Sequence, residues 1–260
     1  MEKFLTDELF LTAVELANLA ANISKKYFRQ PLDIDSKDGL YPVTLVDREI
    51  ETCLRQRIKH LYPTHGIIGE EFANENAGKQ YVWVIDPIDG TVAYTTGKPT
   101  FTTLIALLEN GQPIIGIIDQ AILDDRFIGV MGEGAWLNGV NLSSSICDSL
   151  SLARLNATTP YMFRNDDEQA AFARVHKEVK LTSFGSDAYA YGLLAAGHID
   201  LIMEADLKYY DVASIIPVVG ESGGIITDWQ GNPITQNFSG QCLASANAKL
   251  HDLALKIINN

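Results

Sequence analysis

Acidic residues gather at the end of one apolar segment of this chain. Residues 81–85, Tyr-Val-Trp-Val-Ile, have the apolar and aromatic composition of a buried strand, and Asp86 and Asp89 follow directly. Pro87 lacks a backbone N–H and cannot extend a central strand, so we expect the strand to end near Asp86. Two carboxylates are then presented where α/β enzymes place their ligands, at the carboxyl end of a strand.

These two carboxylates need a countercharge if they are to stay close together, and a hard divalent cation with oxygen ligands supplies one. Gly90 would let a bound group approach the backbone, and Thr91 adds a hydroxyl. Taken alone, however, the same residues are equally typical of an acidic surface turn in which Thr91 caps the next helix. The interpretation therefore depends on the other acidic residues of the chain.

Three further acids stand where a predicted element meets a loop: Asp47, Glu70 and Asp211. By itself, Asp47 in the first turn of a helix is explained by the helix dipole. Asp211, just before a predicted helix that begins at Val212, is explained by N-capping. A capping residue can also be a metal ligand, so neither explanation excludes a site.

The composition limits the class of function. The chain has 260 residues, 47% hydrophobic content and a formal net charge of -13, which disfavours nucleic acid as a partner. A phosphorylated substrate stays possible if metal ions reverse the local charge. Cys53, Cys147 and Cys242 form no paired motif and predict a reducing, cytoplasmic location. No apolar run reaches the length of a membrane span, and the histidines lack the spacing of a zinc hydrolase.

The first half is predicted to pack two helices against a hairpin-rich sheet. Apolar residues at helical spacing predict helices over 5–28 and from Thr44 to Pro63, with a loop at 31–43 between them. The pair Asn110-Gly111 is a strong hairpin signal. Besides the strand before Asp86, the apolar runs that predict strands are 67–71, 101–108, 113–120 and 126–131, followed by a turn-rich segment at 132–139.

The second half is predicted to alternate strands and helices after a boundary at Ser143–Ser145, which divides the chain into halves 1–145 and 146–260. The predicted strands are 152–157, 180–184, 199–203 and 224–227. The predicted helices are 166–179, 187–196, 212–222 and 247–258. Alternation of this kind indicates a layered α/β sandwich.

The order and spacing of these motifs resemble the inositol monophosphatase superfamily. The matching segments are Gly-Glu-Glu at 69–71, Trp-Val-Ile-Asp-Pro-Ile-Asp-Gly-Thr at 83–91, Gly-x-Gly-Ala-x-x-Asn-Gly at 132–139 and Tyr-Asp-Val-Ala at 210–213. Members are Mg²⁺-dependent, lithium-sensitive phosphomonoesterases. The resemblance implies an α/β (α+β) fold, a layered αβαβα sandwich of the inositol monophosphatase/fructose bisphosphatase type. The Asp-x-x-Asp spacing is a poor match to the Asp-x-Asp of a haloacid-dehalogenase-type phosphatase.

The resemblance also implies two or three Mg²⁺ ions per site. One ion would be held by Glu70, Asp86 and the carbonyl of Ile88. A second would be held by Asp86, Asp89 and Asp211, so that Asp86 bridges the two. Glu70 would also help to hold a third, weaker ion.

The catalytic set implied by the resemblance is Asp47, Thr91 and Glu70. Asp47 would accept a hydrogen bond from Thr91, and this pair would orient the attacking water. The backbone N–H groups of Gly90 and Thr91 would bind the phosphate. The reaction expected is an in-line displacement without a covalent phosphoenzyme, with metals that lower the pKa of the water and stabilise the leaving alkoxide.

Several segments look most like the histidinol-phosphate phosphatase branch of this superfamily. They are 97–101 with 104–107, 116–120, 187–191, and Glu204 followed by Tyr210-Asp211. Inositol-type members usually carry Thr-Asn-Phe where this chain has Val-Ala-Tyr at 92–94, and Trp where it has Tyr210. They usually carry a small residue where it has Asp187. Histidinol phosphate carries an ammonium group and an imidazole. Asp187 and Glu204, together with Asp89, are therefore expected to bind the leaving group through charge-assisted hydrogen bonds.

Alternatives stay open at this point. Asp187 could instead cap the helix that begins near Ala188. The favoured reaction is conversion of L-histidinol phosphate to L-histidinol and phosphate, a step of histidine biosynthesis, and inositol 1-phosphate is the second candidate substrate. A catalytically silent phosphate-binding or scaffold protein on the same fold is the alternative of another class. The resemblance suggests a homodimer, with a small phosphorylated substrate and neither nucleic acid nor membrane as partner.

Overall fold

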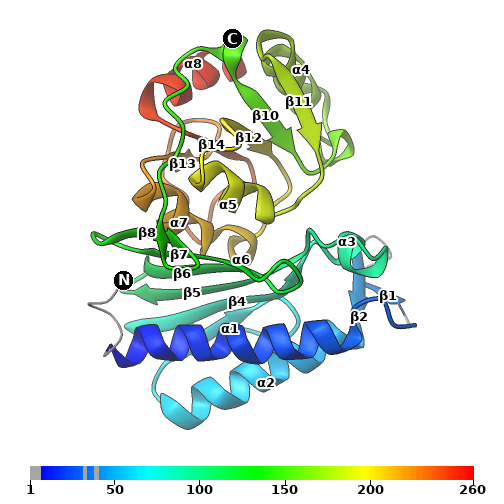
Figure 1. The fold of residues 1–260 in the computed structure, drawn as a ribbon, viewed down its shortest axis with the longest axis vertical. Coiled ribbons are helices and arrows are strands. Elements are labelled where there is room, and N and C mark those ends of the chain that lie inside the picture. The colour runs from blue at the N-terminus through cyan, green and yellow to red at the C-terminus, as the bar shows by residue number, and fades with distance from the viewer. Residues whose placement is uncertain (1–6, 32–33, 38–40) are drawn as a thin grey trace.

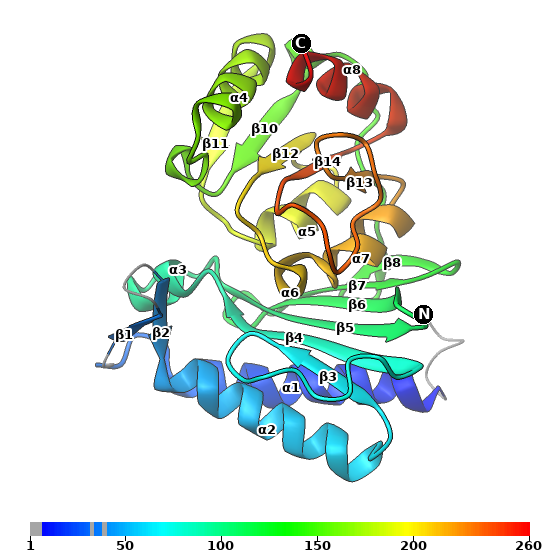
Figure 2. The ribbon, with the colours of Figure 1, turned by 180° about the vertical axis from the view of Figure 1, so that it is seen from behind.

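Helices and sheets alternate in five layers in the computed structural model, which describes residues 7–31, 34–37 and 41–260 (Figure 1). Two long helices cover one face of a large sheet, short helices lie between this sheet and a smaller one, and two helices cover the outer face of the smaller sheet (Figures 1 and 2). The three helical layers contain, in order, α1 (Glu8–Tyr27) and α2 (Leu45–Leu61); α5 (Tyr189–Ala195), α6 (Tyr209–Val212) and α7 (Ile215–Glu221); and α4 (Asp166–Glu178) and α8 (Ala248–Ile258). The αβαβα sandwich expected from the sequence is confirmed.

The large sheet has the strand order β3-β4-β5-β6-β7-β8-β9, in which β3 and β4 are parallel and the other neighbours antiparallel. The predicted hairpin is confirmed, since Asn110 and Gly111 take positive φ angles of 51° and 83° between β5 and β6. The strands are β3 (Gly66–Gly69), β4 (Tyr81–Asp89), β5 (Thr102–Glu109), β6 (Gln112–Gln120), β7 (Asp125–Val130), β8 (Gly134–Leu137) and β9 (Val140–Asn141).

The smaller sheet has the order β11-β10-β12-β14-β13 and mixes parallel and antiparallel pairs. Its strands are β10 (Arg154–Ala157), β11 (Leu181–Phe184), β12 (Leu201–Glu204), β13 (Ile225–Thr227) and β14 (Cys242–Ser245). The remaining elements are β1 (Ile34–Lys37), β2 (Tyr41–Thr44), α3 (Thr91–Thr95), η2 (Leu150–Leu152) and η3 (Pro160–Met162). No helix in this described part of the chain is long and apolar enough to span a bilayer.

Four expectations need correction. The segment 31–43, predicted as a loop, contains the antiparallel pair β1 and β2, and the turn-rich segment 132–139 contains β8. Strand β14 was not predicted, because its four residues between polar segments are too few for a clear pattern. The predicted helix 212–222 begins later, as α7 at Ile215, and Val212 is the last residue of the separate helix α6, since Pro217 has no N–H to donate to Ala213 in a continuous helix. Residues 5–6, 32–33 and 38–40 of these predictions lie outside the described residues.

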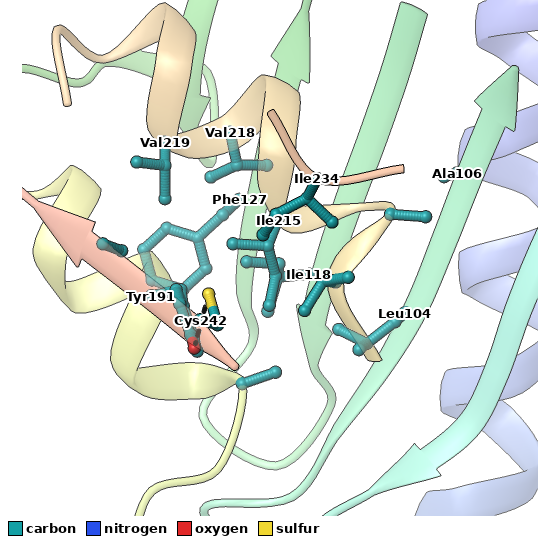
Figure 3. Close-up of a cluster of buried hydrophobic side chains, with 14 of the residues drawn as sticks. Leu104, Ala106, Ile118, Phe127, Tyr191, Ile215, Val218, Val219, Ile234 and Cys242 are labelled. Carbon is teal, nitrogen blue, oxygen red and sulfur yellow. Dashed lines mark hydrogen bonds between the residues drawn. The ribbon is translucent and has the colours of Figure 1, made fainter. Parts of the chain in front are cut away.

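The large sheet is buried on both faces. On β4, Trp83 and Ile85 pack toward α1 and α2, whereas Val82 and Val84 belong to the cluster on the opposite face. That second cluster joins residues of both predicted halves. Figure 3 shows Leu104, Ala106, Ile118 and Phe127 of the large sheet against Tyr191 of α5 and Ile215, Val218 and Val219 of α7. The halves 1–145 and 146–260 therefore share a core.

Two glycines let helix α7 approach the large sheet closely. A Cβ atom built on Gly116 would lie 2.0 Å from the carbonyl oxygen of Ser214, and one on Gly129 would lie 2.4 Å from the backbone of Pro217. These obstacles are backbone atoms, so a rotamer change cannot relieve them. Gly220 in the same helix faces open space.

We expect Gly129→Ala to lower the free energy of unfolding by about 3 kcal/mol, because overpacking against backbone must separate the helix from the sheet. Gly220→Ala is the matched control and should change stability by less than about 1 kcal/mol. Urea denaturation followed by far-UV circular dichroism measures both. Equal stability of the two variants would contradict the direct contact between α7 and the sheet.

Candidate active site

Strand β4 extends further than predicted and carries two acids of the site. Regular pairing with β5 ends where Asp86 lies opposite Leu104, and it resumes where Asp89 lies opposite Thr102. The irregularity between them is a β-bulge, and Pro87 is tolerated there because the ladder needs no N–H from it. The strand therefore does not end near Asp86. The bulge turns both carboxylates toward the same place.

Three carboxylates meet at this place. Asp86, Asp89 and Asp211 each offer an oxygen atom, and these atoms all lie within 4.8 Å of one another. Asp211 comes from α6, in the layer above the sheet, where its Oδ2 accepts the N–H of Lys208 at 2.6 Å. Asp211 thus stabilises the start of its helix and faces the cluster, although it is the third residue of the helix and not the N-cap.

The donor set fits a hard divalent cation. Asp86 is only 2% exposed, and its Oδ1 has no hydrogen-bond partner although it is buried. Glu70, which follows β3, lines the same cavity, and its charge helps to raise the pKa of Asp86. All of these groups are oxygen donors, the type that Mg²⁺ prefers, and neither cysteine nor histidine is among them.

Without a cation, the cluster resists ionisation. Burial, followed by the charges of Glu70, Asp89 and Asp211, raises the pKa of Asp86 well above its usual value. Burial likewise raises the pKa of Asp211 to about 7, with a further contribution from Glu70. These shifts mean that the folded chain pays for bringing the carboxylates together, and a bound cation would remove that cost.

Asp47 and Thr91 do not form the hydrogen bond that the resemblance implies. The Oδ2 of Asp47 accepts both the N–H and the hydroxyl of Thr44, at 2.9 and 2.6 Å, in a capping box at the start of α2. The hydroxyl of Thr91 instead donates to the carbonyl of Ile88 at 3.1 Å. Asp47 is 1% exposed, and the charge of Glu70 contributes to its raised pKa after the larger effect of burial.

Asp187 lies against the glycine of the acidic turn. Gly90 has a φ of 79°, and a Cβ atom there would lie 2.8 Å from both Cγ and Oδ2 of Asp187. Ser186 and Asp187 also have positive φ, 85° and 45°, so the chain is bent sharply toward the site. The N-cap of α5 is Ala188 and no side chain caps it, which rules out the capping role considered for Asp187. The N–H of Ala188 donates to Asp89 at 2.6 Å.

Glu204 is held by two partners that the sequence did not reveal. Its Oε1 accepts the N–H and hydroxyl of Thr158 at 3.0 and 2.6 Å, and its Oε2 accepts the hydroxyl of Tyr191 at 2.8 Å. Burial nonetheless raises the pKa of Glu204 above its ordinary value. Thr158 stands in a polar loop without any motif, so only the fold brings it to Glu204.

A cavity of about 390 Å³ unites these groups. Every predicted site residue except the buried Asp47 lines it. Those lining residues are Glu70, Asp86, Ile88, Asp89, Gly90, Thr91, Asp187, Glu204 and Asp211. The rim adds Arg164 and Asp206, which form an ion pair at 2.5 Å. The first half thus supplies the acidic turn, and the second half supplies the opposite wall.

Comparison with known proteins identifies relatives over the whole fold. The model of the inositol monophosphatase family matches residues 5–260. The bifunctional phosphatase IMPL2, chloroplastic, of Arabidopsis thaliana is 43% identical over 89% of this chain and 67% of its own length. The histidinol-phosphatase of Mycobacterium tuberculosis is 32% identical, with 97% and 98% of the two chains covered. The structure of an inositol monophosphatase from Zymomonas mobilis superposes with a TM-score of 0.89 at 37% identity, covering 98% and 99%.

The crowded carboxylates predict an inverse dependence of stability on pH in the metal-free protein. A carboxyl whose pKa is higher in the folded than in the unfolded chain stabilises the fold at low pH. That contribution is lost as the pH rises through the folded pKa, about 7 for Asp211 and Asp187. In EDTA, the Tm should therefore fall between about pH 5 and about pH 8.

Asp86→Asn should raise the Tm in EDTA at about pH 8 by roughly 3–6 °C, because an amide removes one charge from the cluster. The same variant should lose most of the stabilisation that Mg²⁺ gives the wild type. Differential scanning calorimetry with and without Mg²⁺ checks both effects. A variant less stable than the wild type in EDTA would show that the carboxylates do not repel one another.

Proposed function

This chain belongs to the inositol monophosphatase family and is therefore a phosphatase, and we propose that it hydrolyses L-histidinol phosphate to L-histidinol and phosphate. Magnesium is typical of the family, and the cluster of Asp86, Asp89 and Asp211 fits it. The observation that carries the choice of substrate is the carboxylate of Asp187 in the cavity beside the cluster. Support also comes from the histidinol-phosphatase of Mycobacterium tuberculosis, which covers almost the full chain.

The carboxylate of Asp187 has the properties expected of a binding group for a cationic substrate. No donor among the described residues makes a hydrogen bond to its side chain, and burial raises its pKa to about 7, with a further contribution from Glu204. Lys98 opposes the shift but is the smallest of the three effects. An ammonium or imidazolium group of the substrate would keep Asp187 ionised and compensate its burial. A substrate with hydroxyl groups alone would leave that charge without a partner.

The catalytic roles follow from the same arrangement. Glu70, Asp86, Asp89, Asp211 and the carbonyl of Ile88 would hold two or three Mg²⁺ ions. When bound, the ions would supply the positive charge that neutralises the phosphoryl oxygens and lowers the pKa of water. The remaining tasks, phosphate binding and water orientation, fall to other groups of the chain.

We assign phosphate binding to the backbone N–H groups of Gly90 and Thr91. Thr91 and Asp47 orient the attacking water. For this the hydroxyl of Thr91, which donates to Ile88 in the structure, would turn toward Asp47 or the water. The carboxylate of Asp47 is already fixed by Thr44 and can accept one more donor on its other oxygen.

Inositol 1-phosphate is the second candidate substrate, favoured by the inositol monophosphatase of Zymomonas mobilis at 37% identity. A silent phosphate-binding or scaffold protein is disfavoured, since all the expected ligand positions carry acids and both Thr91 and Asp47 are present.

We further propose a cytoplasmic homodimer. Support comes from the exposed apolar side chains of Val140, Ile146 and Leu152, of which 71%, 95% and 61% is exposed.

The decisive experiment measures phosphate release in Mg²⁺ from L-histidinol phosphate, inositol 1-phosphate and glycerol phosphate, with EDTA as the inactive control. Wild type should prefer L-histidinol phosphate. Asp187→Asn should lower kcat/KM for this substrate by about ten- to a hundred-fold, the cost of about 1.5–3 kcal/mol for a lost charge-assisted partner. Glycerol phosphate should be nearly unaffected, because it makes no use of Asp187.

Equal losses on the cationic and the neutral substrate would contradict the role of Asp187 in substrate selection. A higher kcat/KM of the wild type for inositol 1-phosphate would transfer the assignment to the second candidate. Release of phosphate at the full rate in EDTA would exclude the metal-dependent reaction altogether.

A further inference from the structure

The loop that carries Glu70 is closed at its base by the sheet. Strand β3 ends at Gly69, and the chain returns to pair with it at Glu75. The N–H of Ile67 donates to the carbonyl of Glu75 at 2.7 Å, and the N–H of Glu75 donates back at 2.8 Å. This bridge between Ile67 and Glu75 brings together the two chain segments that flank the loop 70–74. It does not contact Glu71 or Phe72, the residues that follow Glu70.

Those residues are held by a buried carboxylate of helix α2. Oε2 of Glu51 accepts the N–H of Glu71 at 2.7 Å, and Oε1 accepts the N–H of Phe72 at 3.3 Å. Arg55, one turn further along the helix, donates to Oε1 of Glu51 at 2.7 Å and to the carbonyl of Phe72 at 3.1 Å. It also donates to Glu75 at 3.1 Å. The pair thus binds the chain after Glu70 at Glu71, Phe72 and Glu75.

Glu51 and Arg55 hold the loop through close contacts that are shielded from solvent. Glu51 is fully buried and Arg55 is 5% exposed. A Cβ atom on Gly69 would lie 2.0 Å from Oε1 of Glu51, so the strand end has to be glycine for the carboxylate to reach the loop. A buried ion pair contributes little net stability, because desolvation offsets its attraction. Its definite effect here is to fix the position of a backbone segment.

We propose that Glu51 and Arg55 are positioning residues that hold Glu70 at the cavity beside Asp86 for cation binding. This inference rests on the proposed metal-dependent function. Asp47, Glu51 and Arg55 stand at i, i+4 and i+8 on one face of α2, so a single rigid helix sets the position of Asp47 and of Glu70 together. Outer partners that orient a metal ligand typically alter metal affinity by about 10- to 100-fold when they are lost.

Glu51→Gln tests the grip with little change of shape. An amide has one acceptor and one donor end, whereas both oxygens of Glu51 accept. Whichever way the amide turns, its NH₂ faces an N–H of the loop or the guanidinium of Arg55. We expect about 10- to 100-fold weaker Mn²⁺ binding by isothermal titration, a higher Mg²⁺ requirement for activity, and kcat near the wild-type value at saturating Mg²⁺. Amide hydrogen exchange at Glu71 and Phe72 should accelerate.

Glu15→Gln is the matched control, because Glu15 pairs with Arg57 of the same helix at 2.9 Å, away from the loop. It should leave Mn²⁺ affinity and both amides unchanged. Arg55→Lys is the second variant and keeps the charge while losing the bond to Phe72. If Glu51→Gln does not fold, Arg55→Lys should still weaken Mn²⁺ binding and accelerate exchange at Phe72.

Mn²⁺ affinity within two-fold of the wild type in a folded Glu51→Gln variant would overturn the proposal, even if its Tm falls. Unchanged exchange at Glu71 and Phe72 would also overturn it, and this readout needs neither metal nor substrate. Failure of the proposed function looks different, because the wild type itself would then bind no Mn²⁺.

Discussion

Electrostatic repulsion among buried carboxylates is the constraint on which the rest of this structure depends. Asp86, Asp89 and Asp211 bring their oxygens within 4.8 Å, and the charge of Glu70, from the loop after β3, adds to the repulsion at Asp86. A flexible chain would separate such groups, since each raises the pKa of the next. The five-layer sandwich prevents this by anchoring Asp86 and Asp89 to β4 and Asp211 to α6, both of which pack on the apolar core. The buried Oδ1 of Asp86 has no hydrogen-bond partner and is the atom at which a bound cation would offset the repulsion.

Several backbone irregularities also lie at this place. A bulge interrupts β4 between Asp86 and Asp89, Gly90 has positive φ, and Ser186 and Asp187 approach it from the second half with positive φ of their own. Each feature costs local stability, and each turns a carboxylate toward one cavity. The shared core of Figure 3 offsets this cost, because it presses α5 and α7 onto the large sheet. The proposed substrate selection and cation binding would thus depend on contact between the two halves.

The acidic turn was predictable because its chemistry is local. The apolar run before Asp86 and Asp89 placed both acids at one end of a strand, although not the bulge that lets β4 continue through Asp89, and the capping box of Thr44 and Asp47 also involves only neighbouring residues. The partners of Glu204 were not predictable, since Thr158 and Tyr191 meet it only through the layering of the second half. The role of Glu51 was predictable only in part. Its i+4 spacing from Asp47 and to Arg55 is visible in the sequence, but the loop that it holds is not.

Anomalous X-ray diffraction from crystals soaked in Mn²⁺ tests the central claim most directly, because it locates the cation without assuming a substrate. The account predicts strong anomalous peaks within coordination distance of Asp86, with one peak shared with Asp89 and Asp211 and one with Glu70. It also predicts that Asp86→Asn crystals lose them. A saturated soak with no peak at Asp86, or with its peaks elsewhere on the molecule, would contradict the account.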